Sequence, residues 1–362
     1  MSSNSSSPKP ALAAFARIAA PLRRAVAWPL FWPLLTLALL LAGNGVFNPG
    51  FLSLHWQNGH LHGNLVDIAN RAAPLAVVAL GMTGVIAVRG LDISVGAVLA
   101  ISATVAAWIV VRLTAAGDSP GLMPLWLAIL AALAAALACG AWNAALVLKA
   151  GMQPIVATLV LMVAGRGIAQ LIGGGQIITV YYPPYAFLGG GFLFGLPFPL
   201  FVVAALFAFL YLATERTALG LFVRSIGHNP LAAHVAGVRA RAITAVAYVF
   251  CAFCAGVAGL LVSSNVSSAD ANNAGLMMEL DAILAVCLGG TALTGGRFSL
   301  AGSVLGALII QALTSTIYAA GVPPQVNLVV KAVLVFAVML LQSPEFRGEV
   351  RRRFSRKAGA EA

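Results

Sequence analysis

Long apolar runs separated by short polar connections recur along the whole chain, and this pattern constrains the fold more than any other feature. Most runs approach the roughly 20 residues that a helix needs to cross a membrane. Of the 362 residues, 61% are hydrophobic and 9% are charged, whereas a soluble domain carries roughly 25% charged residues. The sequence therefore predicts an all-α polytopic membrane protein of about 10 transmembrane helices, at 28–43, 66–88, 94–112, 122–146, 154–172, 198–213, 241–263, 277–291, 300–319 and 326–342.

The basic residues indicate how the chain is oriented. A net charge of +11 could suggest a nucleic-acid partner, but its distribution argues against one. If the N-terminus is cytoplasmic, every Lys and Arg outside the spans falls in a cytoplasmic segment, which is the positive-inside pattern. Four basic residues fall within spans: Arg71, Arg112, Arg166 and Lys331. We therefore expect both termini to be cytoplasmic and no nucleic-acid partner.

The chain divides into a cytoplasmic N-terminal tail (1–27), a transmembrane domain (28–342) and a basic cytoplasmic tail (343–362). The start lacks the geometry of a cleavable signal, and the basic tail is expected to be attracted to anionic membrane lipid. Residues 90–101 and 295–308 resemble each other, since each opens a predicted outgoing helix with small residues. Such an echo is expected of a transporter built from repeats, or it reflects composition alone.

The sequence offers no enzymatic site. It lacks the G-x-x-x-x-G-K-[ST] phosphate loop, so we do not expect this chain to hydrolyse ATP. His55, His60 and His62 share one polar loop, where solvated side chains are a better interpretation than a metal site with convergent ligands. The four cysteines fall in spans, and Cys251 and Cys254 are interpreted as small packing residues.

Polar side chains within the spans are costly in a bilayer and here follow helical faces. Hydroxyl, amide and guanidinium groups suit a polar, uncharged solute such as a sugar, so these residues are candidates for a substrate path. Interhelical polar clamps are the alternative. We favour the path for Arg166 and Gln311, and the clamp for the i, i+4 pair Asp67 and Arg71. The path candidates are Asn70, Arg166, Gln170, Gln311, Ser315, Tyr318, Asn327 and Lys331.

Three acidic residues lie at predicted helix starts. Asp92 precedes the span at 94–112, where an acid can cap the helix and complement its dipole. Glu279 and Asp281 are two residues apart on a predicted helix, so they point in different directions. Paired acid chemistry is therefore not expected of them.

A polar island, 215–242, interrupts the apolar sequence with four arginines. Within it, Asn229 is a predicted N-cap and Pro230 fits the first position of a helix. Gly237 is the predicted C-terminal stop, and Ala232, Ala233 and Ala236 would give the helix a small, smooth surface. A helix this short is not stable alone in water, which suits an element held by a partner.

Three stretches together resemble a known family. They are "GMTGVIAV" followed by "GLDISVGA", then "RTALG" followed by "IGHNPLAAHVAGV", and finally "ELDAILAVCLGGTALTGGRFSLAGSVLGA". In this order they resemble the ribose/xylose/arabinose-type sugar permeases of bacterial ABC importers, over roughly 65–342. Within that family "DIANRAAP" (67–74), "LMVAGRGIAQLI" (161–172) and "SADANNAGLMMELDAI" (268–283) look most like the galactofuranose permeases.

The resemblance implies a type-II-like ABC importer permease in a bacterial inner membrane. It implies that 215–240 is a coupling segment whose short helix docks on an ABC ATPase. It implies no cofactor on this chain, since ATP and Mg would bind to the ATPase. It also implies two further partners, a second permease chain and a periplasmic sugar-binding protein. The binding protein would dock on 44–65, 173–197 and 264–276. The coupling residues would be Gly227, Asn229, Pro230, Ala232, Ala233, Ala236 and Gly237.

Two alternatives remain open from the sequence. One is an ABC permease for another small polar solute, such as a branched-chain amino acid or a nucleoside. The other is a secondary transporter without an ATPase, which would need ion-binding groups at mid-membrane. For that role the spans offer Arg166 and Lys331, neither with an evident acidic partner.

Overall fold

The computed structural model is almost entirely helical in the part of the chain that it describes, which is 30–47, 50–57, 59–114, 121–321 and scattered positions between 323 and 340. The helices are α2 (Phe31–Phe47), α3 (Asn64–Ala87), α4 (Val95–Thr114), α5 (Met123–Leu148), α6 (Pro154–Gly173), α7 (Pro183–Gly190), α8 (Phe198–Glu215), α9 (Ala218–His228), α10 (Pro230–Val235), α11 (Ala240–Asn265), α12 (Met278–Leu288) and α13 (Leu300–Ala319). The strands are β1 (His55–Gln57), β2 (His60–His62), β3 (Ile178–Thr179), β4 (Phe192–Leu193), β5 (Leu196–Pro197) and β6 (Ser268–Ala269).

Seven described helices are long and apolar enough to cross a membrane: α3, α4, α5, α6, α8, α11 and α13. Every predicted span up to residue 319 coincides with a helix. At the span predicted for 277–291, α12 has only 11 residues and reaches about 16 Å at 1.5 Å per residue. The chain nevertheless crosses the bundle here, from β6 at one end to Gly296, whose amide donates to the Ala87 carbonyl, at the other, so α12 forms part of the crossing. Within the predicted span at 326–342 the structure describes only scattered positions, and those positions are helical.

Proline and glycine set several helix boundaries. Pro124, Pro154 and Pro199 stand in the first turns of α5, α6 and α8, where a missing amide hydrogen costs nothing. At the other end of α6, Gly174 adopts a left-handed conformation with φ of 62°, and its turn redirects the chain towards β3. Helix ends are therefore fixed locally, as their sequence signals predict.

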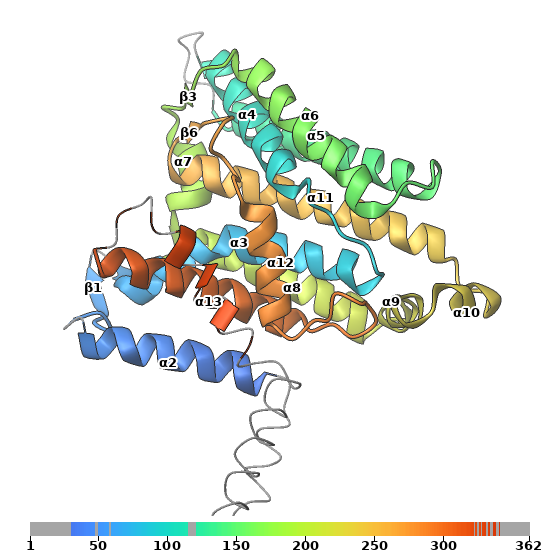
Figure 1. Cartoon of the computed structure of the whole chain (residues 1–362). Coiled ribbons are helices and arrows are strands. Elements are labelled where there is room, and N and C mark those ends of the chain that lie inside the picture. Colours follow the sequence, from blue (N-terminus) through green and yellow to red (C-terminus); the bar gives the residue numbers. More distant parts are fainter. Residues whose placement is uncertain are drawn as a thin grey trace, which may run out of the picture.

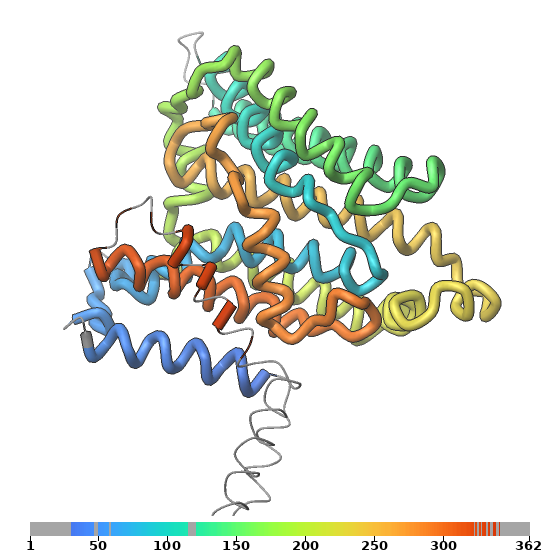
Figure 2. The backbone as a smooth tube through the Cα atoms, viewed as in Figure 1, coloured from blue at the N-terminus to red at the C-terminus, as the bar shows by residue number. Residues whose placement is uncertain are grey.

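The centre of the bundle is α3 against α11. α4 and α5 pack on α11, and α12 and α13 pack on α3 (Figures 1 and 2). Small residues allow these close approaches: a Cβ added to Gly81 would lie 2.9 Å from Cys254 Cβ, and one added to Gly140 would lie 2.8 Å from Val249 Cα. Cys251 and Cys254 are free and buried at this contact, so their interpretation as packing residues is confirmed.

The two ends of the bundle differ. One end carries α9 and α10, and is called the α10 end. The other carries α7 and three strand pairs, and is called the hairpin end (Figure 1). β1 pairs with β2, β3 with β6, and β4 with β5, all antiparallel. The β3–β6 pair joins segments about ninety residues apart, so two connections distant in the sequence meet at this end.

Candidate functional site

Two adjoining hollows open at the hairpin end, between α3 and α13. Their volumes are about 300 Å³ and 340 Å³, and both are lined by Arg71, Gln311 and Tyr318. The smaller hollow adds Asn70, Asn265 and Thr314 to the lining, and the larger adds Asn64, Asp67 and Ser315. Amide, hydroxyl, guanidinium and carboxylate groups thus face the same space, between apolar walls that include Pro74, Leu261 and Ile68.

Some of these groups are already engaged, and others are available. Asn265 Nδ2 donates to the Gly189 carbonyl at 2.8 Å, and Thr314 Oγ1 donates to the Ile310 carbonyl at 2.8 Å. Asn70 Oδ1 is buried and has no hydrogen-bond partner within the described part of the chain. Because buried acceptors are almost always satisfied, this oxygen fits a hydroxyl donor of a ligand or a water molecule.

The hollows bring together four of the predicted path residues: Asn70, Gln311, Ser315 and Tyr318. Their neighbour Arg71 joins them. The sequence favoured a clamp between Asp67 and Arg71, but both side chains are exposed and no ion pair joins them in the described structure. Both line the larger hollow, so the structure places this pair with the path candidates.

Arg166 and Gln170 lie elsewhere, on α6. Arg166 Nη1 donates to the carbonyls of Ala274 at 2.5 Å and Ala271 at 3.2 Å. Gln170 Nε2 donates to Asn272 Oδ1 at 2.5 Å. These side chains hold the loop between β6 and α12, and neither lines the two hollows, so a path role for Arg166 and Gln170 stays a prediction. Asn327 and Lys331 lie outside the described residues.

The same loop carries an exposed acid with a defined role. Asp270 Oδ2 accepts a hydrogen bond from Asn273 Nδ2 at 2.7 Å, and its Oδ1 accepts from the backbone amide of Asn272 at 2.9 Å. The bond from the Asn273 side chain holds the pKa of Asp270 below its ordinary value. Asp270 therefore shapes the loop from within, while Arg166 fixes it to α6.

The connections at the hairpin end contact one another. His60 of β2 stacks on Phe192 of β4 with ring centroids 4.5 Å apart, and the Leu61 amide donates to the Gly195 carbonyl at 2.9 Å. Aromatic side chains remain exposed at this end, including Trp56 and Phe194. No group of His, Cys, Asp and Glu side chains that could hold a metal ion occurs among the described residues.

At the α10 end, α10 forms as its sequence predicts. Asn229 Oδ1 accepts from the amides of Leu231 at 3.0 Å and Ala232 at 3.1 Å, so its prediction as an N-cap is confirmed. Gly237 follows with φ of 83°. Leu231 and Val235 are four residues apart, and 73% and 82% of their respective surfaces are exposed. An exposed apolar pair on a six-residue helix is the signal for a partner surface that sequence reasoning missed.

Two of the predicted coupling residues face inward and so need correction as surface residues. Ala233 is buried with Ala87, Val88, Val223 and Ile226. Gly227 is buried near the end of α9, where an added Cβ would overlap the Ala87 carbonyl oxygen and the Gly296 amide. The remaining coupling candidates, Asn229, Pro230, Ala232, Ala236 and Gly237, are exposed.

Arg89 fixes α9 to the transmembrane core. It follows α3 in a left-handed conformation with φ of 64°, which is rare for a residue other than glycine. Its Nε donates to the Gly227 carbonyl and its Nη2 to the His228 carbonyl, both at 2.7 Å. A guanidinium on the last carbonyls of a helix also complements the helix dipole. The Gly296 amide donates to the Ala87 carbonyl at 3.0 Å, and Gly227 of α9 lies against both groups. Helix α9 therefore packs against the two connections that contain or adjoin the echoed sequences.

Asp92 stabilises the turn ahead of α4, and the predicted capping of the helix itself is corrected, because its partner Ser94 precedes Val95, the first helical residue. Asp92 Oδ1 accepts from the Ser94 amide at 3.0 Å and from Ser94 Oγ at 2.6 Å, ahead of α4. Asn143 of α5 donates to the same oxygen at 3.3 Å and to Ser94 Oγ at 2.8 Å. Burial raises the pKa of Asp92, although the bonds from Ser94 and Asn143 oppose the shift. This connection therefore joins α4 to α5 near the α10 end.

The chain belongs to the family described as the permease component of the branched-chain amino acid transport system, whose family model matches residues 64–339. Among its relatives, the galactofuranose transporter permease protein YtfT of Escherichia coli (strain K12) is 47% identical over 326 residues, covering 90% of this chain and 93% of that protein. The fructose import permease protein FruF of Bifidobacterium longum is 35% identical, covering 92% and 94%. The ribose import permease protein RbsC of Escherichia coli (strain K12) is 32% identical, covering 86% and 92%. No solved structure matches the chain significantly.

The chain is therefore a multi-pass membrane permease of a bacterial ABC sugar importer. This confirms the resemblance drawn from the three sequence stretches. As a permease component it is not itself an enzyme and binds no cofactor, since ATP is handled by the ATPase of the importer. An ATPase and a solute-binding protein are general partners of such a permease.

Proposed function

We propose that this chain translocates a galactofuranose-type sugar through the hollows at the hairpin end, driven by an ATPase bound at the α10 end. The observation that carries the path is the shared lining of Arg71, Gln311 and Tyr318, beside the unpartnered acceptor of Asn70. Amide and hydroxyl groups, with one guanidinium and the Asp67 carboxylate, offer donors and acceptors to the hydroxyl groups of a sugar. The 47% identity to a galactofuranose permease supports the choice of sugar.

The distribution of charge supports a cytoplasmic α10 end. Arg216, Arg224, Arg239 and Arg241 lie in or beside α8, α9 and the start of α11, and Arg89 contacts α9. Basic residues concentrate on the cytoplasmic side of membrane proteins. The hairpin end would then face the periplasm, where the connections that carry β1 to β6 offer Trp56, Tyr181 and Phe194 to a sugar-binding protein.

The coupling segment would transmit the movement of the ATPase through α10 and α9. Leu231 and Val235 supply the apolar contact for a groove on the ATPase, and Arg89 with Gly227 joins α9 to the core. A second permease chain, identical or related, would complete the path. The apolar faces of α5 and α6, which include Trp126, Leu130 and Val163, are exposed to lipid or to such a chain.

The sugar is tested by competition. We would reconstitute the permease with its ATPase and binding protein, then measure ATP-dependent uptake of labelled galactose in the presence of methyl galactofuranoside or methyl galactopyranoside. The proposal predicts that the furanoside competes and the pyranoside does not. Stronger competition by ribose or fructose than by the furanoside would contradict the choice of sugar while leaving the importer class intact.

A further inference from the structure

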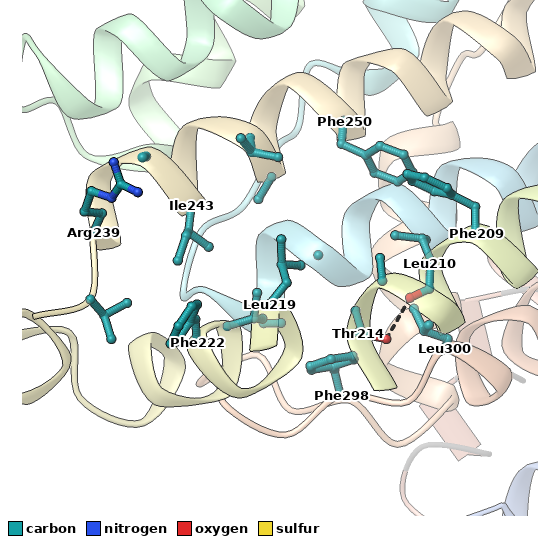
Figure 3. A pocket seen from close by; sticks show the side chains of 18 of the residues that line it. Phe209, Leu210, Thr214, Leu219, Phe222, Arg239, Ile243, Phe250, Phe298 and Leu300 are labelled. Atoms are coloured by element: carbon teal, nitrogen blue, oxygen red, sulfur yellow. Dashed lines mark hydrogen bonds between the residues drawn. The ribbon is translucent and has the colours of Figure 1, made fainter. Parts of the chain in front are cut away.

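A large apolar cavity lies behind the coupling segment, enclosed by α8, α9, α11 and the α10 end of α3 (Figure 3). Its volume is about 750 Å³, and its lining includes Phe209, Phe222, Phe250 and Phe298. Among the side chains that line it, Thr214 and Arg239 carry polar atoms. Thr214 Oγ1 already donates to the Leu210 carbonyl at 2.8 Å, so apart from Arg239 no side chain of the lining has a free hydrogen-bond donor.

The cavity continues into a second apolar hollow between α8 and α11. This hollow has a volume of about 570 Å³, shares Phe209, Val246 and Phe250 with the first, and has no polar side chain in its lining. Phe209 and Val246 are each 59% exposed. The two spaces therefore form one elongated groove that opens sideways into the membrane.

One end of this groove is cationic. Figure 3 shows Arg239 at one side of the cavity, with Ile243 and then Phe250 further along α11. These residues are spaced at four and seven along the helix and so share a face. The Arg239 guanidinium is exposed and makes no hydrogen bond or ion pair to the described part of the chain, and Arg241 lies two residues further on.

We propose that this groove binds one anionic phospholipid, with an acyl chain along α11 and the phosphate on Arg239. An empty space with carbon walls excludes water, and an acyl chain fills it without an unsatisfied polar group. A guanidinium matches a phosphate in charge and hydrogen-bond geometry. A neutral lipid would fill the groove equally well but would leave the cation unpaired.

The bound lipid would support the coupling segment from behind. Leu219, Phe222 and Val223 of α9 form one wall of the cavity, while Ala236 and Gly237 after α10 form part of another. Its acyl chain would fill the space between α9 and the core and would contact both. The binding itself does not depend on the proposed function, whereas any effect of the lipid on transport does.

Gly84 of α3 provides a selective test. It lines the cavity, and a Cβ added there would meet no atom within 4 Å, so Gly84→Phe should fill the groove without displacing the backbone. Gly43 of α2 has equally open space around it and lines none of the described cavities. Gly43→Phe is therefore the matched control.

The full chain would be reconstituted in vesicles of phosphatidylcholine with added phosphatidylglycerol, re-extracted, and analysed by native mass spectrometry for retained lipid. We expect the wild type and Gly43→Phe to retain phosphatidylglycerol, and Gly84→Phe to lose it. Arg239→Gln, at an exposed position, should keep a lipid but lose about tenfold of the preference for phosphatidylglycerol, the size of a charge-assisted hydrogen bond. Equal lipid retention by Gly84→Phe and the wild type, or an unchanged preference in Arg239→Gln, would overturn the proposal.

Discussion

Replacing Gly227 by alanine tests how tightly the coupling segment is seated on the transmembrane core. The new Cβ would lie 2.6 Å from Gly296 Cα and would overlap the Ala87 carbonyl oxygen and the Gly296 amide. Carbon atoms in good contact are about 3.5–4.0 Å apart, so the shortfall is about 1 Å. All three neighbouring atoms belong to the backbone, so no side-chain rotation relieves the overlap.

The structure limits how this overlap is relieved. If α9 moves away from the core by that distance, Arg89 loses its 2.7 Å contacts with the carbonyls of Gly227 and His228. Overpacking of this kind costs about 1–3 kcal/mol, which shifts the seated and displaced positions of α9 by about 5- to 150-fold. The surface of α10 is not altered, so binding of the ATPase should be retained.

We would measure sugar uptake and ATP hydrolysis together in proteoliposomes containing the complete importer. For Gly227→Ala we expect hydrolysis to persist while the sugar transported per ATP falls several-fold. Gly167→Ala on α6 is the matched control, because a Cβ added there meets nothing within 4 Å. Wild-type transport per ATP in Gly227→Ala would refute the idea that this contact transmits movement.

Three further predictions concern the two ends of the bundle. Gln311→Leu should reduce uptake several-fold at unchanged ATP hydrolysis, because it removes a polar group shared by both hollows; normal uptake would exclude these hollows from the path. Arg166→Gln should increase hydrogen exchange at 271–276, which its guanidinium holds, and should weaken stimulation by the binding protein; unchanged exchange would contradict this positioning role. The pKa of Asp92 is raised in the folded state, so the folded state takes up a proton more readily than the unfolded state. The free energy of unfolding should therefore increase as the pH falls through the folded pKa towards 3.8. Thermal unfolding should show this increase in stability for the wild type and not for Asp92→Asn.

The long helices could be predicted from sequence because an apolar run of about 20 residues has few alternatives in a membrane. The capping of α10 by Asn229 could also be predicted, because it depends on neighbours two and three residues away in the chain. The length of α12 could not. Its composition resembles that of a span, but the turn before it at Met277, with φ of 63°, depends on packing against other elements.

Side-chain contacts with backbone atoms explain most of the contacts that could not be predicted from the sequence. Arg166 binds carbonyl oxygens of a distant loop, and Arg89 binds carbonyl oxygens of α9. Every residue has a backbone carbonyl, so the amino-acid sequence does not indicate which carbonyl an arginine will bind. Ala233 was assigned to the smooth surface of α10 because small residues suit both a smooth surface and a close approach, and only the fold distinguishes the two. In contrast, Gln311, Ser315 and Tyr318 could be found from helical spacing, because one face of α13 lines the larger hollow.

The most direct test of the account is whether α10 holds the ATPase. The tagged chain would be purified from its own membranes in mild detergent, and the co-purifying chains identified by mass spectrometry. We predict that a chain with a phosphate-binding loop co-purifies with the wild type and is lost when Leu231 and Val235 are both changed to aspartate. Phe194→Asp, at a side chain that is 88% exposed at the hairpin end, is the control and should retain that chain. Retention of the ATPase by that double variant would contradict docking at α10, and a wild-type chain that arrives without any ATPase would contradict the central claim.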